Sequence, residues 1–346
     1  MSLPAVPKDT VSSKVLLGIG LVLTSAVCLA AQNIISKLFF VAGYLAGYGS
    51  LGGWIAPQFS NIIMLLALRM ALMAGLLAIV APRLYANTFT DIQQLARDFR
   101  RLRFVVGSGF CLFVGLTSLY FSLSQIAAGI AIATFFIYPA ITLLLAWRFL
   151  KQPPRRYQIG LIPLVFCGIV LTTSSTATSL TATGDPFFGI LGGLVAGLSF
   201  GVYGIFAELV LQPKESQRSL HPVPFSLVTF ITVSALSSIS LFFMPSISVA
   251  ADSWPPILAM TVFSALITVV AYVLNNFGIR LIGASLTALI SASTPALTAL
   301  FAWFALQEAL QSQQILGVAF VTVGVAALSF KAQGLKAQGL KAKQRR

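Results

Sequence analysis

The sequence predicts an all-α membrane protein whose ten transmembrane helices form two inverted five-helix repeats. Three observations indicate this fold: a composition poor in charge, ten long apolar segments, and an internal repeat whose two copies differ in charge. Hydrophobic residues make up 58% of the 346 residues, and charged residues only 9%. Soluble domains carry about 25% charged residues, so we expect a lipid bilayer to solvate much of this surface.

Ten apolar segments of about membrane-spanning length follow one another along the chain. They lie near residues 15–41, 60–82, 103–124, 126–150, 157–177, 187–211, 223–245, 255–278, 281–306 and 312–330. These runs do not alternate apolar with polar residues, which favours helices over barrel strands. The first run continues to Val41, beyond the core of a signal peptide, so we expect this helix to be retained.

Basic residues occupy alternate connections between these segments. Arginine and lysine gather at 83–103, 148–156, 212–221, Arg280 and the C-terminus. No lysine or arginine occurs in the four other connections, which are 43–59, 178–186, 246–254 and 307–311. The positive-inside rule therefore predicts that both termini are cytoplasmic, in a multi-pass protein of the cell (inner) membrane. It also explains the net charge of +14 without nucleic-acid binding.

The regions outside the apolar segments receive their own predictions. Residues 43–58 are rich in glycine and predict a flexible external loop, and residues 86–101 predict a short interfacial helix. The expected divisions are a cytoplasmic tail (1–14), a first repeat (15–177), a second repeat (178–330) and a basic cytoplasmic tail (331–346).

The internal repeat appears when the sequence is shifted by 156 residues. Nine of 25 positions are identical between 126–150 and 282–306, including the pairs Pro139/Pro295 and Trp147/Trp303. Because five crossings are an odd number, the second copy would enter the membrane upside down. The turn that follows 126–150 is basic, whereas the corresponding turn carries Glu308 and no basic residue, as opposite orientations require.

Motifs in both halves carry a family resemblance. The second-half motif residues are Ala271, Tyr272, Gly283, Ala284, Ser285, Pro295, Trp303, Gln307, Glu308, Gly317 and Gly324. Their first-half counterparts are Ala128, Gly129, Pro139, Trp147, Phe149, Leu150, Gly160 and Gly168, preceded by Asn33, Lys37, Leu68 and Arg69. This pattern resembles the EamA-type branch of the drug/metabolite transporter superfamily. The resemblance implies ten helices, cytoplasmic termini, and a central cavity lined mainly by helices 1, 3, 4, 6, 8 and 9. Gln152, where the second copy has Glu308, departs from the family pattern.

Three charged residues within apolar runs are candidates for function, because charge inside hydrocarbon is costly. Arg69 could contact an anionic substrate or a gate, or it could fix packing by pairing with backbone carbonyls. Lys37 could contact substrate at the outer mouth or reach the interface. Glu208 could couple transport to protons, since burial raises a carboxyl pKa, or it could face the cytoplasmic headgroups.

Uncharged polar residues within apolar runs should face the interior of the bundle, because an unpaired polar group in lipid is costly. The predicted substrate-binding residues are Asn33, Lys37, Arg69, Tyr120, Tyr138, Tyr203, Tyr272 and Asn276. Pro139 and Pro295 predict matched helix kinks in the cavity wall, or kinks that are merely tolerated.

The sequence contains no enzyme signature. His221 is the only histidine, no phosphate-binding motif occurs, and Cys28, Cys111 and Cys167 do not suggest a metal site. No cofactor is expected. We therefore predict a secondary transporter that moves a small metabolite, such as an amino acid, organic acid or amphipathic compound, by alternating access. Its partners are the substrate and the bilayer, with a homodimer left open. The rivals are a membrane assembly factor or receptor and a lipid-modifying enzyme.

Overall fold

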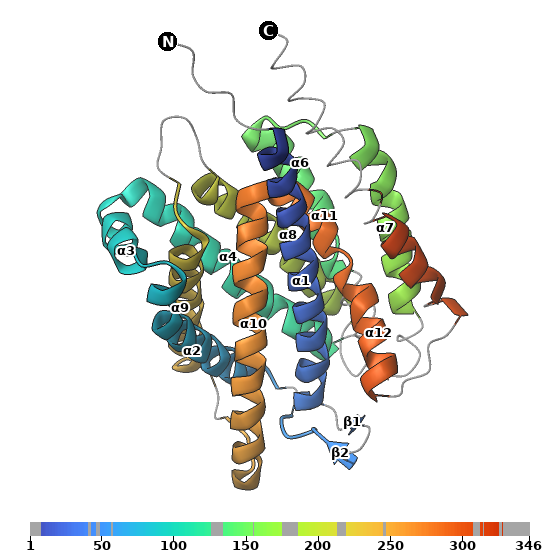
Figure 1. Cartoon of the computed structure of the whole chain (residues 1–346). Coiled ribbons are helices and arrows are strands. Elements are labelled where there is room, and N and C mark those ends of the chain that lie inside the picture. The colour runs from blue at the N-terminus through green and yellow to red at the C-terminus, as the bar shows by residue number, and fades with distance from the viewer. Residues whose placement is uncertain are drawn as a thin grey trace, which may run out of the picture.

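The computed structural model describes residues 8–40, 43–45, 49–56, 58–125, 134–154, 156–174, 186–212, 219–244, 247–306, 312–313, 315–324 and 327. Long helices make up most of this part of the chain (Figure 1). They are α1 (Lys8–Phe40), α2 (Phe59–Leu84), α3 (Thr88–Arg97), α4 (Phe99–Gln125), α6 (Tyr138–Leu150), α7 (Arg156–Ser174), α8 (Pro186–Leu211), α9 (Pro222–Leu241), α10 (Trp254–Ile282), α11 (Ala284–Ser291) and α12 (Thr294–Leu306). A 3-10 turn, η2 (Ala251–Ser253), precedes α10, and a further apolar helix covers Ile315–Gly324.

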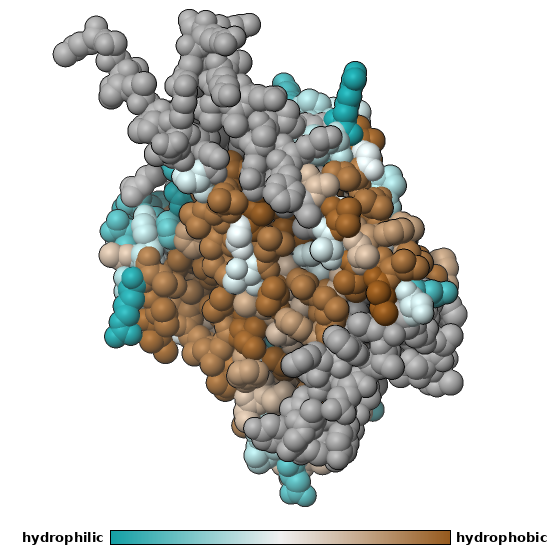
Figure 2. All heavy atoms as spheres, turned by 45° about the vertical axis from the view of Figure 1, so that its right-hand side comes forward, coloured by the Kyte–Doolittle hydropathy of each residue, from teal (hydrophilic) through white to brown (hydrophobic). Residues whose placement is uncertain are grey.

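Six helices of the described chain are long and apolar enough to cross a membrane. They span Ser13–Phe40, Phe59–Leu84, Phe99–Ser122, Phe187–Leu211, Pro222–Leu241 and Ala251–Ile282. Three apolar helices are shorter, at Tyr138–Leu150, Arg156–Leu171 and Ile315–Gly324. Figure 2 shows a broad hydrophobic surface with hydrophilic residues toward its edges. An all-helical multi-pass membrane protein is therefore confirmed, whereas ten crossings remain a prediction.

The segment that was expected to be a flexible loop contains a small hairpin. Strands β1 (Gly43–Leu45) and β2 (Gly49–Leu51) pair in antiparallel register. The next residues fold back onto α1: the Gly53 N–H donates to the Leu38 carbonyl at 2.9 Å, and the Ile55 N–H donates to the Phe39 carbonyl at 3.0 Å. These bonds satisfy carbonyls that the end of α1 would otherwise leave unpaired. By contrast, α3 confirms the predicted helix within 86–101.

Close packing of long helices forms the core. Helix α1 packs along α10, α4 along α8, and α2 along α9; Figure 1 shows α1 and α10 side by side. Small residues allow these approaches. A Cβ added at Gly115 would lie 2.6 Å from the Phe200 ring, and one at Gly278 would overlap Val22. Glycine is therefore required where α4 meets α8 and where α10 meets α1.

The two matched prolines mark breaks between helices rather than kinks within them. Pro295 is the second residue of α12, and a turn at 292–293 separates α12 from α11. Pro139 is likewise the second residue of α6 and follows a turn at 136–137. Proline has no N–H to donate, and the first turn of a helix is where that donor is not needed. The chain therefore interrupts the helix instead of bending it.

Candidate functional site

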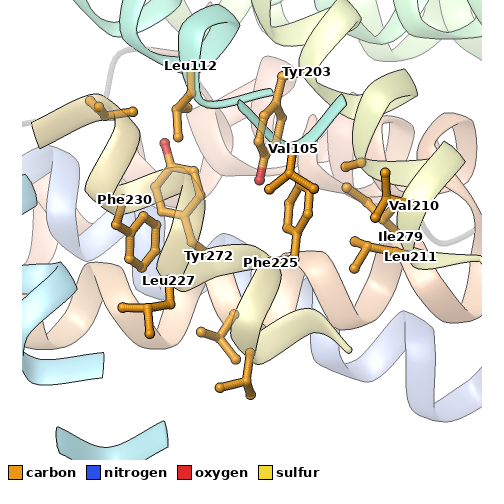
Figure 3. Close-up of a cluster of buried hydrophobic side chains, with 14 of the residues drawn as sticks. Val105, Leu112, Tyr203, Val210, Leu211, Phe225, Leu227, Phe230, Tyr272 and Ile279 are labelled. Atoms are coloured by element: carbon orange, nitrogen blue, oxygen red, sulfur yellow. The ribbon is translucent and has the colours of Figure 1, made fainter. Parts of the chain in front are cut away.

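A hydrogen-bonded chain of polar side chains crosses the interior of the bundle. The Tyr203 hydroxyl on α8 donates to Asn276 Oδ1 on α10 at 2.8 Å, and Asn276 Nδ2 donates to Ser226 Oγ on α9 at 2.9 Å. Asn276 and Ser226 are fully buried. Figure 3 shows Tyr203 beside Phe225, within the apolar cluster that surrounds these hydrogen-bonded side chains. The predicted residues Tyr203 and Asn276 therefore meet in the interior, where each satisfies the other.

Arg69 lies in the same interior, on α2, with only 4% of its surface exposed. Its guanidinium carbon sits 5.9 Å from the centre of the Tyr120 ring on α4. Tyr272 on α10 is close enough to interact electrostatically with both Arg69 and Tyr120. The structure thus brings together three predicted residues from three helices. The Nε atom of Arg69 is buried with no hydrogen-bond partner among the described residues.

Tyr138 is the first residue of α6, directly after the break at 136–137, and it contacts α11 of the second half. Its hydroxyl donates to the Ala288 carbonyl on α11 at 3.5 Å. Nearby, Ser291 at the end of α11 donates to Asn275 Oδ1 on α10 at 3.3 Å. Tyr138 therefore connects the matched helix breaks, which sequence spacing alone does not predict.

Of the two predicted residues of α1, Asn33 lies outside this interior group. Asn33 is exposed, and its side-chain amide donates to Thr298 Oγ1 on α12 at 3.0 Å. The side chain of Lys37 lies outside the described part of the structure. The buried polar residues described on this helix are instead Ser25, whose hydroxyl donates to the Ala271 carbonyl at 2.7 Å, and Gln32, whose Oε1 accepts a hydrogen bond from Ser264 at 2.6 Å.

Glu208 on α8 is 2% exposed and connects three parts of the chain. Its Oε1 accepts from Gln152 Nε2 at 2.8 Å, just beyond α6. Its Oε2 accepts from the backbone N–H of Ala284 at 2.5 Å, at the N-terminus of α11. A carboxylate suits the positive end of a helix, and both oxygens are used. The side chain is buried and hydrogen bonded, unlike a residue that faces headgroups.

An open pocket of about 330 Å³ lies between α2 and α4. It is lined by Phe59, Thr117, Ser118 and Phe121. The Thr117 hydroxyl is buried and has no hydrogen-bond partner in the described part of the chain. Thr117 and Tyr120 are three residues apart on α4, so they share a face of that helix.

Sequence reasoning missed several partners of these residues. Ser226 and Ser264 are single hydroxyl residues among many in apolar runs, and nothing in their spacing distinguishes them. Thr117 carries no signal either. Gln152 could have been found, because it occupies the position of Glu308 in the internal repeat.

Comparisons with known proteins agree with this architecture. The sequence matches the EamA-like transporter family over residues 16–174 and 187–330. The chain belongs to this family. This transporter is 36% identical over 322 residues to a Synechocystis sp. protein described as "Uncharacterized transporter sll1319", and the match covers 91% of the chain and 94% of the relative. A protein of known crystal structure shares the fold, with a TM-score of 0.63, 18% identity, and coverage of 94% of this chain and 99% of that one.

Family membership makes the chain an integral, multi-pass membrane transporter with a small-molecule substrate and a lipid environment. Within the described residues, no group of three or more histidine, cysteine or acidic side chains could hold a metal ion. The buried polar side chains of the described residues include tyrosine, asparagine, glutamine, serine and threonine together with Arg69 and Glu208.

The only histidine of this transporter stacks between aromatic rings at the start of α9. Its ring lies 4.0 Å from that of Tyr85 and 5.2 Å from that of Phe277. Burial and the nearby Arg280 lower the pKa of His221 from 6.5 to about 4, although Asp91 opposes this shift. His221 is therefore neutral near pH 7.

We expect the free energy of unfolding to fall as the pH is lowered from about 6.5 to about 4. In this range His221 binds a proton in the unfolded state but stays neutral in the folded state. Thermal midpoints in detergent across this range would measure the loss, which should be on the order of 1–2 kcal/mol after screening by solvent. The His221→Gln variant serves as the control, since it keeps a polar side chain but cannot titrate. An identical pH slope in this variant would contradict the assignment.

Proposed function

We propose that this transporter has ten membrane crossings in two inverted five-helix halves and moves a small metabolite by alternating access. The observation that carries the proposal is a reciprocal contact between helices related by the internal repeat. A Cβ on Gly168 would lie 2.7 Å from Val321, and a Cβ on Gly324 would lie 2.6 Å from Val165. Gly168 and Gly324 are 156 residues apart, as are Val165 and Val321.

Such reciprocity is expected around a two-fold axis. If a residue of one half contacts a residue of the other half, the two residues at the exchanged positions of the repeat also contact each other. An axis that relates halves of one chain in this way is a feature of inverted-repeat transporters. The helix pairs agree with it: α4 packs along α8, and α1, in the first half, packs along α10, in the second.

The matched helix breaks also support the proposal. The Ile137 N–H donates to the Thr134 carbonyl at 3.4 Å, and 156 residues later the Ser293 N–H donates to the Ile290 carbonyl at 3.1 Å. Interrupted helices at corresponding positions of two halves are typical of substrate sites near the middle of the bilayer. We assign the cavity wall to these breaks and to Tyr138, Tyr203 and Asn276.

The orientation belongs to the same proposal. By the positive-inside rule, the basic connections support cytoplasmic termini in a cell (inner) membrane. Glu208, Gln152 and Ala284 then lie at the cytoplasmic end, where they close one side of the bundle. Opening toward the cytoplasm would break these hydrogen bonds. Glu208 is the one acidic residue within the apolar segments of the sequence, which makes it the candidate for proton coupling.

Cysteine labelling tests the inverted topology. Single cysteines at Lys151 and Gln311, in a chain with its three native cysteines replaced, should react on opposite sides of the membrane. An impermeant maleimide applied to intact cells should label Gln311→Cys, and Lys151→Cys should react only after permeabilisation. Labelling of both from the same side would end the proposal of inverted halves.

Flux measurements test transport itself. Metabolite profiles of cells with and without the gene should differ in a small set of solutes, and the purified protein in proteoliposomes should carry at least one of them. An inverted topology without any solute flux would favour the alternative hypothesis, which is a membrane assembly factor or receptor. Chemical conversion of a lipid by the purified protein would favour an enzyme.

A further inference from the structure

We infer that Arg69 binds the carboxylate of a small organic anion, which identifies the chemical class of the substrate. This inference rests on the proposed function. The first observation is that Arg69 is isolated. It is 4% exposed, its Nε has no hydrogen-bond acceptor within the described chain, and its neighbours there are neutral aromatic side chains: the Tyr120 ring at 5.9 Å and, through an electrostatic interaction, Tyr272. Guanidinium remains charged even when buried, so this charge requires compensation.

The chain offers no counter-charge in the membrane. Of its eight acidic residues, seven lie outside the apolar segments of the sequence. The exception is Glu208, which is already bonded to Gln152 and Ala284. Leaving a buried charge without a partner is strongly destabilising, so an anion from outside the chain is the natural partner of Arg69.

The groups around Arg69 suit an oxyanion. Tyr120 and Tyr272 carry hydroxyls, and Thr117, three residues before Tyr120 on α4, has a buried hydroxyl without a hydrogen-bond partner in the described part of the chain. All three can donate, and guanidinium binds a carboxylate through two parallel hydrogen bonds. The ring of Phe230 packs 5.8 Å from that of Tyr272, edge to face, and Figure 3 shows the two together. An anion bound here would therefore have an apolar body beside a charged head.

A purely structural arginine is the competing explanation, and stability without ligand distinguishes the two. An arginine that holds helices together should destabilise the fold when it is replaced by methionine. An unpaired arginine kept for binding should not, because Arg69→Met removes an uncompensated charge from the interior. We expect the thermal midpoint of Arg69→Met in detergent to equal or exceed that of the wild type.

The binding test compares acids with their neutral amides at matched ionic strength. The probes are hexanoate with hexanamide, 3-phenylpropionate with 3-phenylpropanamide, and inorganic phosphate. At least one carboxylate should raise the wild-type midpoint by about 2 °C more than its amide does. Arg69→Met should abolish this difference, and Arg69→Lys, which keeps the charge but not the planar fork, should reduce it.

Each result decides the inference. Equal shifts for acid and amide, or a full response in Arg69→Met, would overturn it. A larger shift with phosphate than with every carboxylate would overturn the assignment of a carboxylate. Proteoliposome flux separates this outcome from failure of the proposed function: flux that is unchanged in Arg69→Met would leave a transporter without this site, whereas acid binding without any flux would leave an anion site without transport.

Discussion

Replacing Glu208 with alanine is expected to lower the free energy of unfolding by about 2–4 kcal/mol, because two donors would lose a charged acceptor in a buried place. The donors are the side-chain amide of Gln152 and the backbone N–H of Ala284. Thermal or SDS denaturation in micelles would measure the loss. The same variant should open this end of the bundle, which the proposed orientation places in the cytoplasm, more often, and a cysteine introduced at Gln212 should react faster with maleimide.

The Glu208→Gln variant is the matched control for this experiment. A glutamine retains one acceptor oxygen but loses the charge that favours the start of α11. The free energy of unfolding of Glu208→Gln should therefore lie between those of the wild type and Glu208→Ala. Wild-type stability in both variants would show that the carboxylate does not hold α8, α6 and α11 together.

Replacing Gly168 with leucine should have the second large effect. A Cβ at this position would lie 2.8 Å from the backbone nitrogen of Val321 and 2.9 Å from the carbonyl oxygen of Gly317. Backbone atoms cannot turn aside as a side chain can, so α7 and the helix at Ile315–Gly324 must separate. We expect a loss of about 1–3 kcal/mol in the free energy of unfolding.

Gly160 lies on the same helix and provides the control. A Cβ there would meet no atom within 4 Å among the described residues. Gly160→Leu should therefore be neutral or slightly stabilising, since leucine favours a helix by up to about 1 kcal/mol over glycine. Similar losses for the two leucine variants would mean that close packing at Gly168 does not matter.

The sequence predicted most of the long helices, because a bilayer imposes their length and apolarity, but it did not predict the division of 281–306 into α11 and α12. The apolar run near 60–82 became α2 (Phe59–Leu84), and the polar stretch 86–101 contained α3. The pairing of Gly43–Leu45 with Gly49–Leu51 was not predicted, because a glycine-rich sequence is compatible with several backbone conformations. The prolines indicated where helices change direction, but whether a helix bends or breaks depends on the helices packed around it.

The candidate site was predictable in composition but not in connection. Burial cost alone indicated that Arg69, Tyr203 and Asn276 face inward. Their partners depend on how helices far apart in the sequence pack, and Tyr203 reaches Asn276 across 73 residues. Asn33 shows the limit of that argument, because one hydrogen bond to Thr298 satisfies it on an exposed face.

The side chain of Asn61 forms a second hydrogen-bonded connection between distant segments, besides that of Glu208. It donates to the carbonyls of Ala56 and Ser248 and accepts from the Ser248 N–H, joining the start of α2 to the segment before η2. In the proposed orientation the hydrogen bonds of Asn61 lie at the opposite end of the bundle from Glu208. In the proposed mechanism, a transporter whose connections at Glu208 and Asn61 are both formed is occluded. Its solute can leave only after one of these connections breaks. If alternating access operates as proposed, breaking both connections together would turn the cycle into a leak.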